Sequence, residues 1–403
     1  MKGLLRGLCI THLLAVCFTA RTYAQSPEVA DPVAAAPIRL GPIGLAPHVT
    51  LTDLGVDTNV FNEPTNPKRD FTFTFSPGAD IWLRTRRGVL SLTGSVDFVY
   101  FNEHSSQRSL TSNALGQYEL RLDRIRPYIS ARTLNTEQRP GFEIDTRAKH
   151  YETDFRTGTE VRIASKTSMR FELQQLRYSF DSREVFDGRQ LSQELNRRLR
   201  TGSLSWRQRL TPLTTWVTTI ARESERFEFQ EIRNSDSFRL STGFELGRFA
   251  LIRGSAFIGY RTLKAADGGL LPTFTGVTGS ADVSYTAPTQ TRINAVAGRD
   301  IQYSYDQTTP YYVQTSWTLT VTQRIVGSWD AAVTGGRDRL AYQSVGDRND
   351  RTDFAGRFGG SVGYTLNDQI RLSFDINSFF RRSDIPGRDY GGVRSGLSVT
   401  YAY

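Results

Sequence analysis

The residues that could form a hydrolytic site are a serine within a glycine-rich segment and the histidines of the mature chain. Gly359-Gly360-Ser361-Val362-Gly363 has the G-x-S-x-G spacing of the nucleophile elbow, which requires a strand, a turn and then a helix. Here the segment lies within a run of alternating apolar and polar residues, which predicts a continuous strand. His104 and His150 lie near predicted loops. They could form a hydrolytic cluster with a serine and an acid, or they could be isolated, solvated histidines.

No metal or cofactor chemistry is predicted. His48, His104 and His150 are widely separated and lack the spacing of metal ligands. Both cysteines, Cys9 and Cys17, lie near the N-terminus, and no phosphate loop, EF-hand loop or dinucleotide fingerprint occurs. We therefore expect no catalytic residues, no metal, no cofactor and no enzymatic activity.

The N-terminal segment predicts an exported protein. Lys2 and Arg6 precede an apolar stretch that is too short to cross a bilayer, so residues 1–24 are expected to be a signal peptide. The Pro/Ala-rich residues 25–43 are expected to form a flexible periplasmic leader, and residues 44–403 a single large domain. The chain has 50 Lys and Arg against 41 Asp and Glu, a net charge of +9. Export and the lack of a basic run argue against nucleic acid as the partner.

From Leu45 onwards the chain repeats long alternating segments separated by turns. One example places Tyr151, Thr153, Phe155, Thr157, Thr159 and Val161 on one face, and Glu152, Asp154, Arg156, Gly158, Glu160 and Arg162 on the other. Side chains alternate across a strand, so these are two separate surfaces. Such segments are about twice as long as the strands of a soluble sandwich, the alternative fold, and match a tilted strand that crosses a bilayer. The pattern predicts an all-β, transmembrane, up-and-down antiparallel β-barrel.

The connections alternate between long and short, as the outer loops and periplasmic turns of such barrels do. This rhythm predicts about eighteen strands, with sixteen as the alternative count, and both termini in the periplasm. One connection, Asp306–Thr309, is short where a long loop is expected. Gln174-Gln175 shifts the parity of its strand and predicts a β-bulge, and the two faces blur in the fifth, eighth, ninth and thirteenth strands.

The polar faces predict a lumen wide enough for an aqueous channel. The expected pore-lining residues, whose opposite charges either select solutes or only brace the wall, are Glu119, Arg121, Glu152, Asp154, Arg156, Glu160, Arg162, Arg170 and Glu172. Aromatic residues near strand ends, including Tyr303, Tyr305, Tyr311 and Tyr312, are expected to form interfacial girdles.

Two segments resemble known proteins. The last strand is apolar at Leu397, Val399, Tyr401 and Tyr403, and it resembles the assembly signal that the barrel-assembly machinery reads in outer-membrane proteins. Leu54-Gly55-Val56-Asp57-Thr58-Asn59-Val60-Phe61 resembles the Asp-x-Asn-aromatic opening of the Putative beta-barrel porin 2 family, which is often associated with exopolysaccharide secretion. The resemblance implies an outer-membrane barrel of a Gram-negative-type bacterium, surrounded by lipid and lipopolysaccharide, but no particular binding residues.

Three functions follow from these features. The first is a porin-like channel that passes polar solutes or assists exopolysaccharide export, with periplasmic export components as possible partners. The second is a plugged structural barrel that anchors a surface polymer or complex, and the third is an outer-membrane barrel hydrolase. The sequence predicts neither the solute nor the oligomeric state.

Overall fold

A computed structural model of the chain describes residues 31–402 except 248–249, 267, 270 and 347–350. A nineteen-stranded antiparallel sheet dominates it, and the shortest member, β1 (Ile38–Leu40), pairs only with the start of the next strand. The other eighteen strands are β2 (Ile43–Asp57), β3 (Asp70–Arg84), β4 (Gly88–Phe101), β5 (Ser109–Leu120), β6 (Ile125–Thr136), β7 (His150–Ala164), β8 (Thr167–Phe180), β11 (Arg197–Thr211), β12 (Thr214–Phe227), β13 (Ser235–Leu246), β14 (Ile252–Ala265), β15 (Phe274–Thr286), β16 (Thr291–Tyr303), β17 (Tyr311–Val326), β18 (Trp329–Gln343), β19 (Thr352–Thr365), β20 (Ile370–Arg382) and β21 (Tyr390–Ala402). No helix among the described residues is long and apolar enough to cross a membrane.

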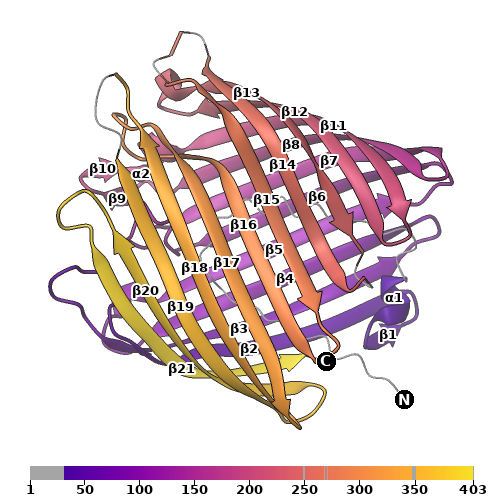
Figure 1. The fold of residues 1–403 in the computed structure, drawn as a ribbon, viewed down its shortest axis with the longest axis horizontal. Helices are drawn as coiled ribbons and strands as arrows, with labels where there is room; N and C mark the ends of the chain where they lie inside the picture. Colours follow the sequence, from indigo (N-terminus) through magenta and orange to yellow (C-terminus); the bar gives the residue numbers. More distant parts are fainter. Residues whose placement is uncertain (1–30, 248–249, 267, 270, 347–350, 403) are drawn as a thin grey trace.

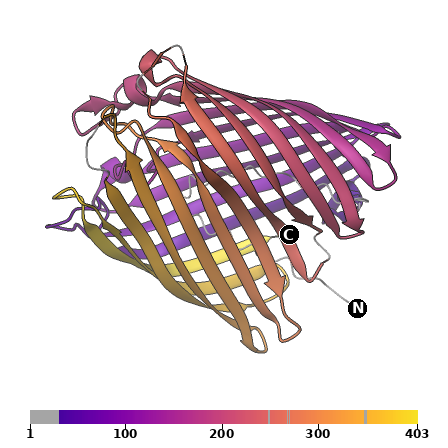
Figure 2. The same cartoon turned by 45° about the horizontal axis from the view of Figure 1, so that its top comes forward.

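The sheet closes on itself. Each long strand pairs with its neighbours in the sequence, and β2 pairs antiparallel with β21 from His48↔Ala402 to Asp57↔Arg394. Figures 1 and 2 show the tilted strands enclosing a lumen. The strands are 12 to 16 residues long, enough to cross a bilayer while tilted. The prediction of an up-and-down barrel is confirmed, with eighteen strands rather than sixteen.

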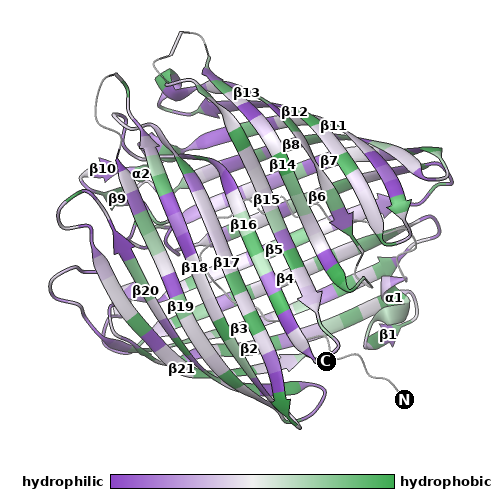
Figure 3. Cartoon of the chain, in the orientation of Figure 1, coloured by the Kyte–Doolittle hydropathy of each residue, from purple (hydrophilic) through white to green (hydrophobic). Residues whose placement is uncertain are grey.

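The two faces of each strand differ as the alternation predicts. Phe171 and Leu173 of β8 point outward and are 48% and 64% exposed, whereas the intervening Glu172 is more covered and faces inward. Along the strands of Figure 3, hydrophobic residues alternate with polar ones. An apolar outer face is unfavourable in water and favourable against lipid, so the wall is built for a membrane.

The connections sort onto two rims. The long loops gather at one end, here called the loop rim, with β9 (Val185–Phe186), β10 (Arg189–Gln190) and α2 (Leu191–Leu195), at the upper left of Figure 1. Two further single turns of 3-10 helix, Ser105–Gln107 and Glu231–Arg233, lie in loops of this rim. The short turns, β1 and the end of β21 lie at the opposite end, the terminal rim.

The leader is folded from Asp31 onwards. Helix α1 (Pro32–Ala35) packs on the inner face of the terminal rim, where Val33 and Ala36 are buried. A Cβ on Gly44 would lie 2.7 Å from the Cβ of Ala36, so glycine permits this close approach. Asp31 caps the helix and forms an ion pair with Arg84.

Two sequence predictions are wrong. The pairing of β8 runs without a shift through Gln174 and Gln175 on both sides, so there is no bulge there. Gln175 is instead a polar residue on the outer face, where it accepts a hydrogen bond from Arg200. The register shifts at Leu51/Leu54 and at Arg162/Ala164.

The expected aromatic girdle is also wrong for three tyrosines at the loop rim. Tyr305, Tyr311 and Tyr312 are 4%, 0% and 6% exposed, so they do not form an outward girdle. They pack instead in buried clusters: Tyr305 with the loop residues described below, Tyr311 with Leu263 and Leu271, and Tyr312 with Leu340 and Tyr342.

Candidate solute pathway and the loops across it

The predicted pore-lining residues lie on the polar face, and several of them pair. Glu160 and Arg170, opposite each other on β7 and β8, form an ion pair of 2.7 Å. Asp154 and Arg156 pair at 2.7 Å along β7. The charges within each pair therefore cancel locally, and the pair of Glu160 and Arg170 also links β7 to β8 through a charge-assisted hydrogen bond.

The remaining predicted residues lie nearer the rims or pair differently. Glu172 accepts a hydrogen bond from the Tyr128 hydroxyl. Glu119 lies 3.6 Å from Arg121, which follows β5 at the terminal rim. Arg162 donates to the carbonyl of Asp123 in the neighbouring turn, and Glu152 lies 3.7 Å from the imidazole of His150. These nine residues therefore form local pairs rather than one site.

The inner charge network extends well beyond the predicted set. On β11, Arg207 is 5% exposed and lies 2.5 Å from Glu245 and 3.7 Å from Glu160. Farther round the wall, Arg261 bridges Glu223 at 2.7 Å and Asp300 at 2.8 Å. Their positions on the inner face follow from the register of β11–β16. In three of these strands, the eighth, ninth and thirteenth, the sequence does not separate the apolar and polar faces clearly, so we did not predict them.

Unpaired basic residues gather inside the terminal rim. A hollow between β6, β7 and β11 is lined by six basic side chains against the two carboxylates of Asp123 and Glu160. Among the described residues, no carboxylate forms an ion pair with Arg124, Arg126, Lys166 or Arg209. This side of the lumen's mouth, along β6, β7 and β11, therefore carries an uncompensated positive charge.

Near the loop rim, the loop of residues 137–149 crosses the lumen. Glu143 accepts a hydrogen bond from the Ser304 hydroxyl at 2.5 Å and one from the backbone N–H of Tyr305 at 3.2 Å. The first loop joins the fifth and sixth strands of the barrel and the second joins the thirteenth and fourteenth. Eight of eighteen positions is nearly half the circumference, so this contact spans the lumen.

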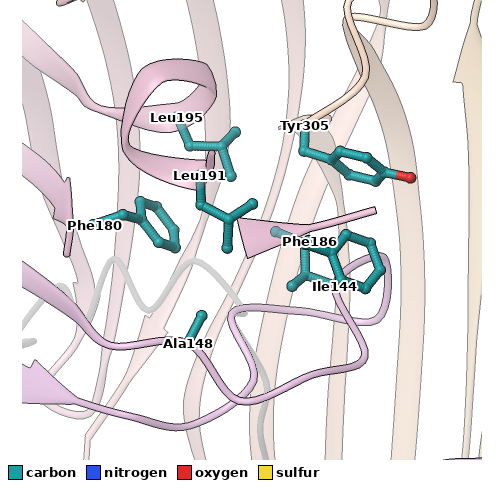
Figure 4. Packing of buried hydrophobic residues seen from close by; sticks show 7 residues of the cluster. All are labelled: Ile144, Ala148, Phe180, Phe186, Leu191, Leu195 and Tyr305. Carbon is teal, nitrogen blue, oxygen red and sulfur yellow. The ribbon is translucent and has the colours of Figure 1, made fainter. Parts of the chain in front are cut away.

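A small apolar core forms where the loops meet. Ile144 and Ala148 of the crossing loop pack with Phe186, Leu191 and Tyr305, as Figure 4 shows. Arg388, in the loop after β20, donates to Asp187 at 3.0 Å and also contacts the Tyr305 hydroxyl. Burial of these side chains from water favours the inward position of the loops.

Ion pairs and hydrogen bonds also attach the crossing loop to the barrel wall. Arg381 of β20, which is 1% exposed, donates to Asp145 at 3.2 Å and to Asp353 at 2.8 Å. Arg351 forms a second ion pair with Asp353. Arg139 donates to the carbonyl of Val60 at 2.7 Å, so the crossing loop is attached both to the segment after β2 and to the end of β20.

Glu143 is the most electrostatically unusual residue in this loop. Burial raises its pKa from 4.5 to about 7, because the charged form loses its hydration. The hydrogen bonds from Ser304 and Tyr305 and the charges of Arg351 and Arg381 act in the opposite direction and are outweighed. The carboxyl group therefore changes charge near neutral pH while the loop is docked.

Beside the crossing loop is a hollow that combines aromatic and polar side chains. Phe142, Tyr178, Tyr303 and Tyr312 line it together with Glu152, Arg197, Gln302 and Gln314. Aromatic faces next to carboxylate, guanidinium and amide groups can contact a polar molecule that also has apolar faces, as sugars do.

The candidates for hydrolysis are not brought together. Ser361 lies in the middle of β19, with no turn or helix after it, which confirms the prediction for this segment. The ring of His104 bonds Asp70 at 2.9 Å, and that of His150 bonds the carbonyl of Ala148 at 3.0 Å. Among the described residues, no group of three or more His, Cys, Asp or Glu could hold a metal ion.

An apolar outer wall, a polar lumen and complete closure define an outer-membrane β-barrel of the porin type, and hence a protein of the outer membrane of a Gram-negative-type bacterium. The model of the family described as Putative beta-barrel porin 2 matches residues 31–403, and the chain belongs to this family.

One solved structure supports the same architecture, and a second also matches the chain. The fold resembles a BenF-like porin from Pseudomonas fluorescens Pf-5, with 10% sequence identity, coverage of 90% of this chain and 99% of that chain, and a TM-score of 0.50. OccK2 (OpdF) from Pseudomonas aeruginosa matches with 11% identity, 90% and 98% coverage and a TM-score of 0.49. No curated protein sequence matches the chain.

Proposed function

We propose that this barrel is a constricted channel for polar solutes with a preference for anions. The observation that carries this proposal is the unpaired basic lining of the terminal rim, at Arg124, Arg126, Lys166 and Arg209. Fixed positive charge at a low-dielectric mouth raises the local concentration of anions and repels cations. The terminal rim would face the periplasm, since short turns lie on that side in outer-membrane barrels.

The more specific version is assistance in the export of an acidic exopolysaccharide. The basic rim would attract the carboxylates of such a polymer. The hollow with Phe142, Tyr178, Tyr303 and Tyr312 offers aromatic faces for sugar rings, and Gln302 offers amide hydrogen bonds. The folded leader beside this rim is where a periplasmic export component would dock.

A second candidate, the plugged anchoring barrel, is favoured by one observation. The core around Ile144, Phe186 and Tyr305 and the contact of Arg388 with Asp187 join loops from different parts of the wall across the lumen. If these loops never separate, the barrel would serve as an anchor and pass nothing.

Conductance in planar bilayers separates the two functions. We expect the wild type to conduct with anion preference under a salt gradient. Removal of residues 139–147 should raise the conductance several-fold. The Arg124→Gln/Arg126→Gln/Arg209→Gln variant should shift the reversal potential towards cations. The control Arg183→Gln, in an exposed loop at the opposite rim, should leave it unchanged. A barrel that stays closed after the deletion, or a cation-selective wild type, would overturn the channel proposal.

The polysaccharide version has its own test. A uronic-acid oligomer added on the terminal-rim side should block the current at lower concentrations than a neutral oligomer of the same length. The rim variant should lose this difference. Equal block by both oligomers would contradict an acidic polymer as the substrate while leaving the channel proposal intact.

A further inference from the structure

Three arginines stand side by side on the outer wall, near the loop rim. Arg198 of β11 is directly opposite Arg177 of β8 on one side and Arg226 of β12 on the other. Neighbouring strands are ~4.8 Å apart, so the row places three like charges at directly opposite cross-strand positions. Like charges directly opposite each other destabilise a sheet, and such a row calls for a counter-charge.

Two more outward-facing arginines enlarge this group. Arg200 lies two residues after Arg198 on β11, and Arg222 lies four residues before Arg226 on β12. We call the five residues the arginine patch, and they are Arg177, Arg198, Arg200, Arg222 and Arg226.

The patch is only partly neutralised by the protein. Arg226 forms an ion pair of 3.0 Å with Asp236, and Arg177 lies 3.7 Å from Glu228. Among the described residues, no carboxylate forms an ion pair with Arg198, Arg200 or Arg222, all three of which are exposed. Three positive charges therefore remain on the face that meets the membrane.

The patch borders the apolar band. On β8, Leu173 and Phe171 follow Gln175 towards the terminal rim, and on β11 the outward residues Leu204 and Trp206 follow Arg200. Phe171, Leu173 and Trp206 are exposed, and Leu204 is partly exposed, as lipid-facing apolar residues are. The arginines thus lie where hydrocarbon gives way to lipid headgroups, on the side that carries the long loops. In outer-membrane barrels that side meets the outer leaflet.

We propose that the arginine patch binds the phosphate groups of lipopolysaccharide in the outer leaflet. A phosphate accepts paired hydrogen bonds from a guanidinium, and two phosphates on one glycolipid could bridge the row of Arg177, Arg198 and Arg226. The site lies outside the lumen, so it does not depend on the proposed function. It also accounts for the blurred faces of the eighth strand, where arginine occupies both sides of β11.

The test compares lipids that differ only in phosphate. Wild-type barrel in detergent is titrated with diphosphoryl lipid A and with the dephosphorylated lipid, and bound lipid is counted by native mass spectrometry. We expect the phosphorylated lipid to bind at least tenfold more tightly. The Arg198→Gln/Arg200→Gln/Arg222→Gln variant should lose this difference and keep its channel conductance.

The control is Arg299→Gln/Arg337→Gln. Both arginines face outward, but their cross-strand neighbours are uncharged: Gly279 and Thr315 for Arg299, Trp317 and Gly356 for Arg337. This control should bind diphosphoryl lipid A as the wild type does. The single variant Arg198→Gln, at the centre of the row, replaces the triple variant if the latter fails to assemble.

Several results would overturn the proposal. They are equal binding of the two forms of lipid A, unchanged binding by the triple and single variants, and equally tight binding of phosphatidylglycerol. A patch covered by a second copy of the chain would also exclude it, and would appear as an oligomer that the triple variant dissociates without any change in lipid binding.

Discussion

The docked position of the crossing loop should depend on pH through Glu143. Its pKa is about 7 in the docked loop, against 4.5 for a solvated glutamate, so the docked state binds the proton more tightly. Docking is therefore most favourable below pH 4.5, weakens as the pH rises, and changes little above about 7. A tenfold difference in proton affinity corresponds to ~1.36 kcal/mol, so the full loss is about 3 kcal/mol. The ratio of docked to undocked loop should fall by roughly two orders of magnitude.

Single-channel recording from pH 4 to pH 9 measures this effect. The wild type should open more often, or to larger conductance levels, as the pH rises from 4.5 to 7. Glu143→Gln keeps the shape and the hydrogen-bonding capacity of the side chain but cannot ionise. The channel of this variant should therefore stay closed at every pH in the range. Glu137→Gln is the matched control, because Glu137 belongs to the same loop, is more exposed and lies 3.8 Å from Lys149. Parallel pH curves for wild type and Glu143→Gln, or a wild type that closes as the pH rises, would refute the reasoning.

Three further changes test the wall and its attachments. Leu397→Arg places a charge on the lipid face and should destabilise the barrel by about 2–4 kcal/mol if the residue lies near the bilayer centre. Ser398→Arg places the same charge in the lumen and should be tolerated. Heat-modifiable gel migration measures the stability of both variants, and equal effects would contradict the assignment of faces. Arg381→Met leaves a buried carboxylate with one arginine fewer and should cost about 3 kcal/mol in thermal unfolding; an unchanged transition would show that the crossing loop is held elsewhere. Gly44→Val should displace Ala36 and expose residues 31–40 to hydrogen exchange, and unchanged protection would count against the packing of α1.

The wall was predictable because its signal is local. A strand that meets lipid on one side and water on the other must alternate, and each turn interrupts the alternation. Tyr151 and Glu152 therefore reveal their faces without any knowledge of their neighbours. The loop after β16 shows the limit of this argument. Asp306–Thr309 lies where a long outer loop is expected, but it is short. Its length does not predict that the neighbouring Tyr305 contacts Glu143.

The crossing loop could not be predicted because its contacts join distant segments without a repeating pattern. Glu143 and Ser304 are 161 residues apart, and neither lies in an alternating segment. The aromatic residues misled us for the same reason. A tyrosine at a strand end suits a membrane interface and an inward-folded loop equally well, and only the path of the loop decides between them. Tyr311, which is fully buried, followed the loops inward.

The distribution of charge gives the net charge of +9 a structural meaning. Within the wall, basic and acidic residues such as Arg207 and Glu245 pair, and these pairs contribute rigidity rather than a field. Within the described part of the chain, two groups of arginines without a carboxylate partner carry part of the surplus, one inside the terminal rim and one on the outer wall around Arg198. Arginine suits both, because its planar guanidinium binds carboxylate or phosphate through paired hydrogen bonds, and its weak hydration lowers the cost of lying beside lipid. Because the two surpluses lie on opposite faces of the wall and towards opposite rims, neutralising one should leave the other intact. Solute selectivity and lipid binding should therefore be separable by mutation.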